Sequence, residues 1–211
     1  MIKLYGTGPS RWVKPYWLLK EMAVPFETVS VSISKGENRS AQYLAINPFG
    51  KVPALADGPV TLFESSAICN YLADKYPEKA LIPRAGTADR GYYDQWISFA
   101  TTELEQPLWR IIKHRFVYPE EKRSAAEIEL AVGDFKKLLT TFSALLADKK
   151  YLVADRFTVA DIAMTYTLRW AQLPSMPAGL LEGEHKVTAY MQRHMERTAF
   201  PHDLYPQAPI S

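Results

Sequence analysis

The sequence predicts two domains: an α/β domain with a mixed four-stranded sheet, followed by an all-α helical bundle. Three observations support this prediction. Strand-like and helical runs alternate over residues 1–77, an Asp57-Gly58 pair separates two of the strand-like runs, and no convincing strand pattern follows residue 87. A chain of 211 residues is long enough for one or two real cores.

The elements of the first domain are expected in the order strand, helix, strand, short helix, strand, strand, helix. Apolar residues at a period of two predict strands at residues 2–5 and 26–33. Strands are also expected at residues 52–56 and 60–63, which flank Asp57-Gly58. Apolar residues at helical spacing predict the helices, which are expected at residues 12–23, 40–46 and 65–76. Pro15 is compatible with the first helix because it falls in the first turn. Asp57-Gly58 is a typical hairpin signal between the last two strands.

A change of pattern separates this domain from the second one. Residues 78–87 are polar, contain Pro83 and Gly86, and are typical of a linker. The second domain is expected over residues 88–211, with helical periodicity at 88–117, 120–148, 158–171 and 183–197. Pro107 lies inside the first of these helices and is expected to kink it.

Charge and composition exclude several functional classes. The chain has 25 Lys and Arg against 23 Asp and Glu, with no long block of one sign, so a nucleic-acid partner is not expected. The single cysteine, Cys69, cannot form an intramolecular disulfide. No signal peptide is visible, and no apolar run approaches the ~20 residues of a membrane helix. These observations predict a cytoplasmic protein without a membrane partner.

A proline at the start of the third strand is the first candidate feature of a binding site. Pro53 follows a Gly50-Lys51 turn, in a position where the missing N–H group normally disfavours proline. A cis Val52–Pro53 bond would turn the backbone N–H and C=O groups of Val52 outward, where an extended peptide can pair with them. The alternative is a trans proline at a strand start, and only about 5% of X–Pro bonds are cis.

Two helix starts are candidate anion sites. Ser65 is a candidate N-cap of the helix over 65–76, where a carboxylate can bind, and Glu64 can accept hydrogen bonds from an ammonium group. Simple capping is the alternative. Ser10, at the start of the first helix, can bond an anion or cap the helix. Position 13 is Val, so no capping box supports the purely structural role.

Together these segments resemble the soluble glutathione transferases, of a bacterial-like type with a serine active site. The similarity covers nearly the whole chain and is carried by NPFGKVPAL at 47–55, LFES at 62–65, ICNYL at 68–72 and FTVADI at 157–162. In the last motif Thr158 and Asp161 fit reciprocal helix caps. The resemblance implies a thioredoxin-like first domain, a cis Pro53, glutathione as co-substrate without a metal, and a homodimer.

The resemblance also implies how glutathione lies. Its γ-glutamyl carboxylate would meet Ser65 and the helix start, its ammonium group would lie near Glu64, and its cysteinyl backbone would pair with Val52 next to Pro53. The candidates for the glycyl carboxylate are Lys51, Lys35 and Arg39. For the last two, solvated loop charges are the alternative interpretation.

Activation of the thiol requires only modest stabilisation of the anion. Lowering a thiol pKa of about 8.5 by about two units requires roughly 2.7 kcal/mol. One hydrogen bond to a charged group supplies roughly 1.5–3 kcal/mol, and a helix N-terminus adds roughly 0.3–1 kcal/mol. The catalytic candidates are Ser10 as the preferred donor, Thr7 as the second, and Arg11 as a positive charge beside the thiolate. Cys69 is expected to be a buried small hydrophobe and not the nucleophile.

The second substrate is expected to be a small electrophile, often planar or aromatic. The candidate lining residues are Trp12, Trp109, Arg110, Lys113 and His114. Core packing of Trp109 with a solvated basic face is the alternative. The expected reaction transfers an alkyl or aryl group to the glutathione sulfur, in detoxification or catabolism. A glutathione-dependent peroxidase or isomerase and a non-catalytic binding protein of the same fold are the alternatives.

Overall fold

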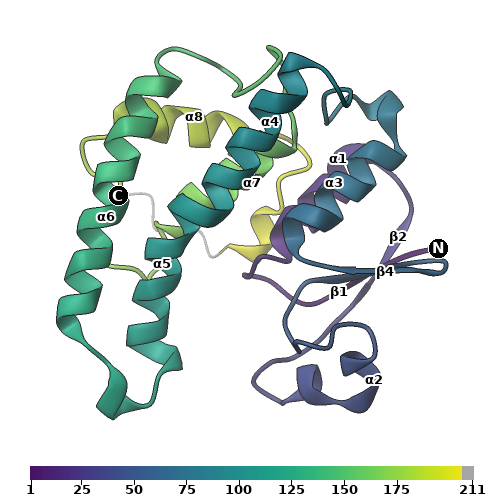
Figure 1. The fold of residues 1–211 in the computed structure, drawn as a ribbon, viewed down its shortest axis with the longest axis horizontal. Helices are drawn as coiled ribbons and strands as arrows, with labels where there is room; N and C mark the ends of the chain where they lie inside the picture. Colours follow the sequence, from purple (N-terminus) through teal and green to yellow (C-terminus); the bar gives the residue numbers. More distant parts are fainter. Residues whose placement is uncertain (206–211) are drawn as a thin grey trace. The chain divides into compact units, whose positions relative to one another are not determined.

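The computed structural model describes residues 1–205, and the chain divides into two compact units. Unit 1 contains Met1–Ile82 and the segment that begins at Arg197, while unit 2 is Pro83–Glu196 (Figure 1). The last six residues of the expected second domain, 206–211, lie outside the described residues.

Unit 1 is built on a four-stranded sheet. The strands are β1 (Ile2–Tyr5), β2 (Phe26–Val29), β3 (Ala54–Asp57) and β4 (Val60–Phe63), in the order β2-β1-β3-β4. β1 is parallel to β2 and antiparallel to β3, and β3 and β4 form a hairpin, which confirms the predicted mixed sheet. β2 is shorter than the expected strand over 26–33. Beyond it, the backbone N–H of Ser32 donates to the Glu37 carboxylate at 2.7 Å, which belongs to a local turn.

The helices of unit 1 lie on both sides of this sheet. α1 (Val13–Met22) and α3 (Ser65–Lys75) pack against each other on one side, and α2 (Ala41–Leu44) lies on the other (Figure 1). Residues at the α1–α3 side form a buried core, which includes Leu4, Leu18, Leu55, Ile68 and Leu72. A smaller cluster forms near α2, where Tyr43 packs with Val31 and Ala54.

Unit 2 is helical, as predicted. Residues 88–117 form one helical run made of α4 (Ala88–Ser98), a π-helical segment (Phe99–Leu104), α5 (Glu105–Ile112) and a second π-helical segment (Lys113–Val117). Pro107 has no N–H group to bond the Glu103 carbonyl, and the first π segment contains that carbonyl. α6 (Ala125–Leu146), α7 (Val159–Trp170) and α8 (His185–Met195) complete the unit.

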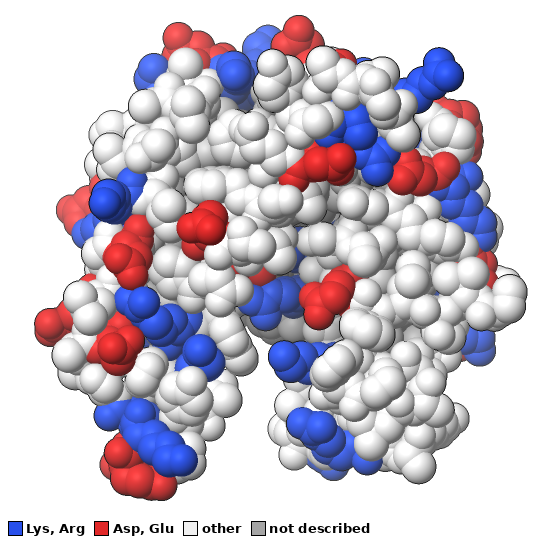
Figure 2. Space-filling view, viewed as in Figure 1, with Lys and Arg blue, Asp and Glu red and all other residues white. Residues whose placement is uncertain are grey.

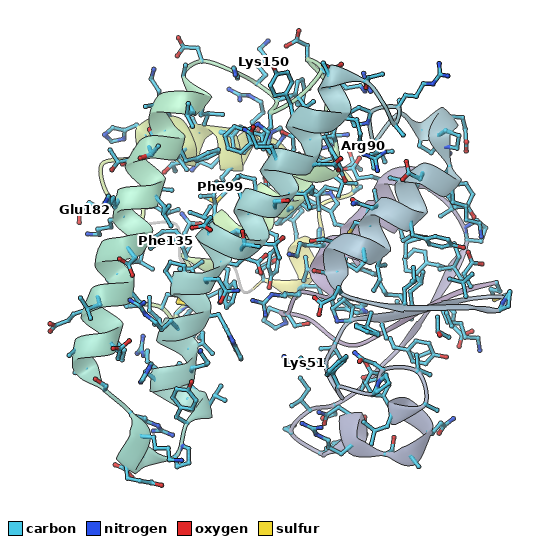
Figure 3. The ribbon with its side chains drawn as sticks, viewed as in Figure 1. Lys51, Arg90, Phe99, Phe135, Lys150 and Glu182 are labelled. Carbon is cyan, nitrogen blue, oxygen red and sulfur yellow. The ribbon has the colours of Figure 1, made fainter. Side chains whose placement is uncertain are left out.

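α7 forms the core of unit 2, because every one of its residues is buried. α4 and α8 pack against it, and α6 packs against α5. Phe135, which is fully buried, lies on the inner side of α6 (Figure 3). No helix within residues 1–205 is both long enough and apolar enough to cross a membrane.

A buried carboxylate fastens the start of α7. Asp161 accepts hydrogen bonds from the backbone N–H of Thr158 at 2.8 Å, from the N–H of Leu152 at 3.0 Å and from the Tyr190 hydroxyl at 2.7 Å. The reciprocal capping of Thr158 and Asp161 is confirmed. Burial raises the pKa of Asp161 to about 6, although these hydrogen bonds act in the opposite direction.

The segment after α8 returns to unit 1. The Arg197 guanidinium donates to both carboxylate oxygens of Glu21 on α1, at 2.8 Å each. The segment from Arg197 onward therefore groups with unit 1 by its contacts, whereas the sequence ranges place it with the helices.

Candidate active site

The loop between β1 and α1 brings two predicted parts of the site together. Gly6 directly follows β1. It has a φ of 136° and donates its N–H to the Val29 carbonyl at 2.9 Å. An added Cβ atom at Gly6 would lie 2.6 Å from Cδ1 of Trp12 and 3.1 Å from Cβ of Val52. The absence of a side chain at Gly6 therefore allows Trp12 and Val52 to approach the loop.

Ser10 is engaged within the same loop. Its hydroxyl donates to the Thr7 carbonyl at 2.6 Å and accepts from the Trp12 N–H at 3.2 Å. α1 begins at Val13 with Trp12 as its N-cap, so the alternative interpretation of Ser10 as the cap of this helix does not hold. The Ser10 hydroxyl instead closes a local turn that precedes the helix.

The other two catalytic candidates lie beside Ser10. Thr7 is exposed, and its hydroxyl has no hydrogen-bond partner within residues 1–205. Arg11 is half-buried. The structure thus places all three candidates in one loop. The Ser10 hydroxyl donates a hydrogen bond to a carbonyl there, and the Thr7 hydroxyl does not.

Val52 lies immediately before β3. The Val52–Pro53 peptide bond is cis, as is Gly8–Pro9. In the part of the chain that is described, neither the N–H nor the C=O group of Val52 has a hydrogen-bond partner. β3 begins two residues later, where Ala54 pairs with Tyr5. Val52 therefore offers one donor and one acceptor beside the Gly6 loop.

Buried side chains fix the turn that leads to Val52. The Lys51 carbonyl accepts hydrogen bonds from the Tyr43 hydroxyl and from Nδ2 of Asn47, both at 2.6 Å, and the Gly50 carbonyl accepts from Nδ2 of Asn38 at 2.7 Å. Burial raises the pKa of Tyr43 to about 12, so the phenol remains a neutral donor. Sequence reasoning missed these three anchors. The only signal was Asn47, which begins the motif at 47–55 directly after the helix expected at 40–46.

The three basic candidates differ in their position relative to this turn. Lys51 is exposed on the part of unit 1 that carries α2 (Figure 3). Arg39 lies close to the turn, because a Cβ atom at Gly50 would be 3.0 Å from its Nη1. Lys35 is exposed in the preceding loop, where its backbone N–H donates to the Ser32 hydroxyl. The structure therefore brings Arg39 to the turn that carries Lys51.

Glu64 and Ser65 form the start of α3. Glu64 is the N-cap residue, without a side-chain capping bond, and Ser65 is the first helical residue, so the prediction of Ser65 as N-cap is wrong. The Ser65 side chain is buried, and its hydroxyl is unpaired among the described residues. The Glu64 carbonyl accepts from the N–H of Ile68 at 2.9 Å, so the amides before Ile68 are not used by the helix. Such amides favour an anion.

The backbone of Glu64 is strained. Its φ of 69° and ψ of 115° lie outside the regions that residues with a side chain normally adopt. Strain of this kind costs on the order of 1–3 kcal/mol and is concentrated at functional sites.

Two side chains near α1 and α3 are buried. Trp12 is only 5% exposed and stacks on Tyr16, with ring centroids 4.4 Å apart. Cys69 is buried, which raises the pKa of its thiol to about 12. A thiol with this pKa is almost entirely protonated at pH 7, and the expectation that Cys69 is buried is confirmed.

The remaining candidates lie in unit 2 and do not form one group. Arg110 and Lys113 line a groove of about 500 Å³ between the first helical run and α6. Arg110 is paired with Asp134 at 2.8 Å and lies 3.7 Å from Glu127. Trp109 and His114 do not line this groove, and Nδ1 of His114 accepts from the backbone N–H of Ser124 at 3.2 Å. Figure 2 shows basic and acidic side chains intermixed over the visible face.

Comparisons with known proteins identify the family. Residues 1–74 match the family model of the glutathione S-transferase N-terminal domain, and residues 106–198 match that of the C-terminal domain. The chain is 32% identical to glutathione S-transferase F10 of Arabidopsis thaliana, over 86% of each protein. It is 33% identical to glutathione S-transferase GstA of Escherichia coli O157:H7, over 85% of each protein.

Solved structures agree with this assignment. Glutathione transferase F7 of Populus trichocarpa superposes with a TM-score of 0.83 at 28% identity, covering 95% of this chain and 96% of that one. A glutathione transferase of Burkholderia graminis with two bound glutathione molecules per subunit superposes with a TM-score of 0.86 at 26% identity, covering 96% of this chain and 87% of that one. The resemblance to the glutathione transferases and the fold predicted from the sequence are both confirmed, while the serine active site stays a prediction. The chain belongs to the glutathione S-transferase family.

Proposed function

We propose that this glutathione transferase binds the glutathione peptide along Val52 and the start of α3, with its sulfur at the loop that contains Ser10. The observation that carries the proposal is the unpaired N–H and C=O pair of Val52, on a turn that three buried side chains hold in place. An extended peptide pairs with such groups in the same way as a neighbouring strand. The ends of the peptide then meet groups of complementary charge.

The γ-glutamyl end of glutathione fits the start of α3. Its carboxylate would accept from the Ser65 hydroxyl and from the amides before Ile68, where the helix dipole adds positive potential. Glu64 would accept from the ammonium group. The glycyl carboxylate would lie toward Lys51 and Arg39, with Lys35 further away along the loop.

Ser10 would stabilise the thiolate by exchanging its acceptor. In the structure its proton is donated to the neutral Thr7 carbonyl. A hydrogen bond to a charged acceptor is about twice as strong as one to a neutral acceptor. The exchange is therefore favourable once the thiol has released its proton to solvent, and Arg11 and the start of α1 would add positive potential.

The thiolate would then attack a small electrophile. A sulfur–carbon bond forms, the bond from that carbon to the leaving group breaks, and the leaving group departs with the electron pair. We propose planar or aromatic electrophiles, which Trp109, Lys113 and His114 would contact with aromatic and basic groups. Arg110 would attract an anionic substrate less strongly, because its charge is already partly neutralised by two nearby carboxylates.

Assembly, domain boundaries and location belong to the same proposal. We propose a homodimer, in which exposed aromatic residues of unit 1 contact a second copy. The proposed domains are residues 1–77 and 88–211, with 78–87 as linker. Along the sequence, the first boundary between the compact units falls between Ile82 and Pro83, inside that linker, and the segment from Arg197 groups with unit 1. We propose the cytoplasm as the compartment.

Calorimetry with reduced glutathione tests the binding site. The wild type should show saturable binding, and Ser65→Ala should weaken it about tenfold, because one hydrogen bond to a charged group contributes roughly 1.5–3 kcal/mol. Ser30→Ala removes an exposed hydroxyl from the same unit and serves as the control. Conjugation of glutathione to an activated aryl halide tests the proposed reaction, and the loss of free thiol measures its rate. Absence of wild-type binding at millimolar glutathione would contradict the proposal.

A further inference from the structure

The segment 197–205, here called the C-terminal strap, is fastened at one end to the last turn of α1. Arg197 donates to both oxygens of Glu21, and the indole N–H of Trp17 donates to one of them at 2.9 Å. The Glu21 side chain is only 8% exposed. A bidentate pair of this kind fixes the orientation of both side chains. The strap therefore has a defined anchor on α1.

Aromatic packing holds the middle of the strap on the same helix. Phe200 is buried and meets the Trp17 ring edge to face at 5.0 Å. The rings of Phe200 and Tyr205 stack at 5.6 Å. The strap, drawn in yellow, lies beside the first part of unit 1 in Figure 1. It thus runs from the C-terminal end of α1 back toward the N-terminal end.

The far end of the strap reaches the loop that carries the catalytic candidates. A Cβ atom at Gly8 would lie 3.2 Å from both Cδ atoms of Leu204, so the Leu204 side chain packs directly on the Gly8 backbone. Burial and then the charge of Asp203 raise the pKa of Tyr16, whose ring stacks on Trp12. Leu204 and Asp203 therefore both lie near the first part of α1 and the loop before it.

We propose that the C-terminal strap positions the Thr7–Ser10 turn for thiolate activation, with Leu204 and Arg197 as positioning residues. This inference rests on the proposed function of that loop. Gly8 lies between the Thr7 carbonyl and the Ser10 hydroxyl, which are joined by the 2.6 Å hydrogen bond. Leu204 packs on Gly8, and Arg197 holds the strap at the other end of α1.

The strap acts on rate more than on binding. Misplacing a reacting group by about 1 Å costs as much as about 10²-fold in rate. The peptide-binding groups of Val52 and Ser65 belong to other elements and have no described contact with the strap. Loosening the strap should therefore shift the ionisation of the bound thiol while leaving glutathione affinity nearly unchanged.

The test compares two variants with a control in the same unit. Leu204→Ala removes the contact with Gly8, and Arg197→Gln removes the bidentate anchor but keeps Leu204. Lys3→Ala is the control, because Lys3 forms an exposed ion pair with Glu27 at 3.3 Å, away from the strap. Ultraviolet thiolate absorbance against pH, kcat, glutathione Kd and Tm are measured for each protein.

Both strap variants should raise the pKa of the bound thiol by about half a unit, which is about a threefold loss of thiolate below that pKa. We expect kcat to fall by a similar factor, glutathione Kd to change less than about twofold, and Leu204→Met to restore the wild-type titration. Lys3→Ala should titrate as the wild type.

Unchanged thiol titration in both folded variants would overturn the role of the strap, even if their Tm values fell. That outcome would leave the proposed function intact, because the wild type would still bind and ionise glutathione. A wild type that binds no glutathione would overturn the proposed function itself.

Discussion

Ser10 and Thr7 differ in what their hydroxyl protons do before glutathione binds. The Ser10 proton is donated to the Thr7 carbonyl, whereas the Thr7 hydroxyl is unpaired within the described residues. The sequence showed that both residues carry hydroxyls near a helix start. It did not show the hydrogen bond from the Ser10 hydroxyl to the Thr7 carbonyl. Hydrogen bonds across three residues depend on backbone angles that residue types alone do not determine.

Replacing each hydroxyl separately identifies the donor. We expect Ser10→Ala to raise the pKa of the bound thiol by about one unit or more, since the lost bond contributes roughly 1.5–3 kcal/mol. Below that pKa, kcat should fall about tenfold or more, with glutathione Kd nearly unchanged. Thiolate absorbance against pH measures the shift. A shift in Thr7→Ala alone would assign the donor role to Thr7.

Glu64 combines a strained backbone with a proposed ligand contact, and two variants separate these properties. Glu64→Gly should raise the free energy of unfolding by about 1 kcal/mol, because glycine adopts a φ of 69° without steric cost. Glu64→Gln should leave stability nearly unchanged. Both should weaken glutathione binding. Urea unfolding and calorimetry measure the two effects, and equal stability of all three proteins would contradict the interpretation of strain.

The anchors of the Val52 turn show which parts of the site the sequence could not predict. The motif at 47–55 indicated Lys51, Val52 and Pro53 because these residues are contiguous. Asn38 bonds the Gly50 carbonyl from twelve residues away, and Tyr43 bonds the Lys51 carbonyl from eight residues away, through hydrogen bonds of buried side chains. Such partners depend on tertiary packing, which a local pattern does not contain.

At the scale of elements, most strands and helices were predictable because their apolar residues recur at regular spacing. The hairpin of β3 and β4 also followed from its turn residues. The starts of α1 and α3 could not be predicted from the sequence. Helix caps depend on backbone angles and can differ by one or two residues from the apolar pattern. The π-helical segment before Pro107 has no periodicity that distinguishes it from α-helix.

The buried carboxylate at the start of α7 should make stability depend on pH. The folded pKa of Asp161 is about 6, above its ordinary value of 3.8, so the protonated form is favoured in the folded state. Its contribution to stability is fully present below pH 3.8 and is lost as the pH rises through about 6. The change corresponds to about 3 kcal/mol.

Urea unfolding between pH 4 and 7 measures this contribution. Asp161→Asn should lose this pH dependence of the free energy of unfolding. It should also be less stable at all pH values, because the amide nitrogen cannot accept from the Thr158 N–H or the Tyr190 hydroxyl. Asp148→Asn is the control, since Asp148 is exposed on the surface. The same pH dependence in wild type and Asp161→Asn would show that other groups cause it.

At the scale of the whole molecule, two exposed aromatic residues provide a surface for a second copy. Phe49 is 61% exposed and meets Phe63, which is 38% exposed, edge to face at 5.3 Å. Phe63 belongs to β4, one of the two edge strands of the sheet. An exposed aromatic pair on a sheet edge favours burial in an interface.

Light scattering at micromolar concentration tests the dimer. The wild type should show twice the chain mass of 23.9 kDa. Phe49→Ser should shift the equilibrium toward monomer, because truncating a buried aromatic anchor costs about 2 kcal/mol or more of association free energy. Tyr92→Ser, which changes an exposed aromatic residue of unit 2, is the control. A wild-type mass near 23.9 kDa would contradict the proposed dimer.

The return of the chain from unit 2 to α1 has a consequence for biosynthesis. A nascent chain emerges in order, so the ribosome synthesises the whole of Pro83–Glu196 between Ile82 and Arg197. At about 5–20 residues per second this interval lasts roughly 6–23 seconds. Throughout it, Trp17 and Glu21 lack their partners Phe200 and Arg197. The first unit to emerge is therefore the last to be completed, and a translation product that stops before Arg197 would present this aromatic and acidic surface of α1 to chaperones.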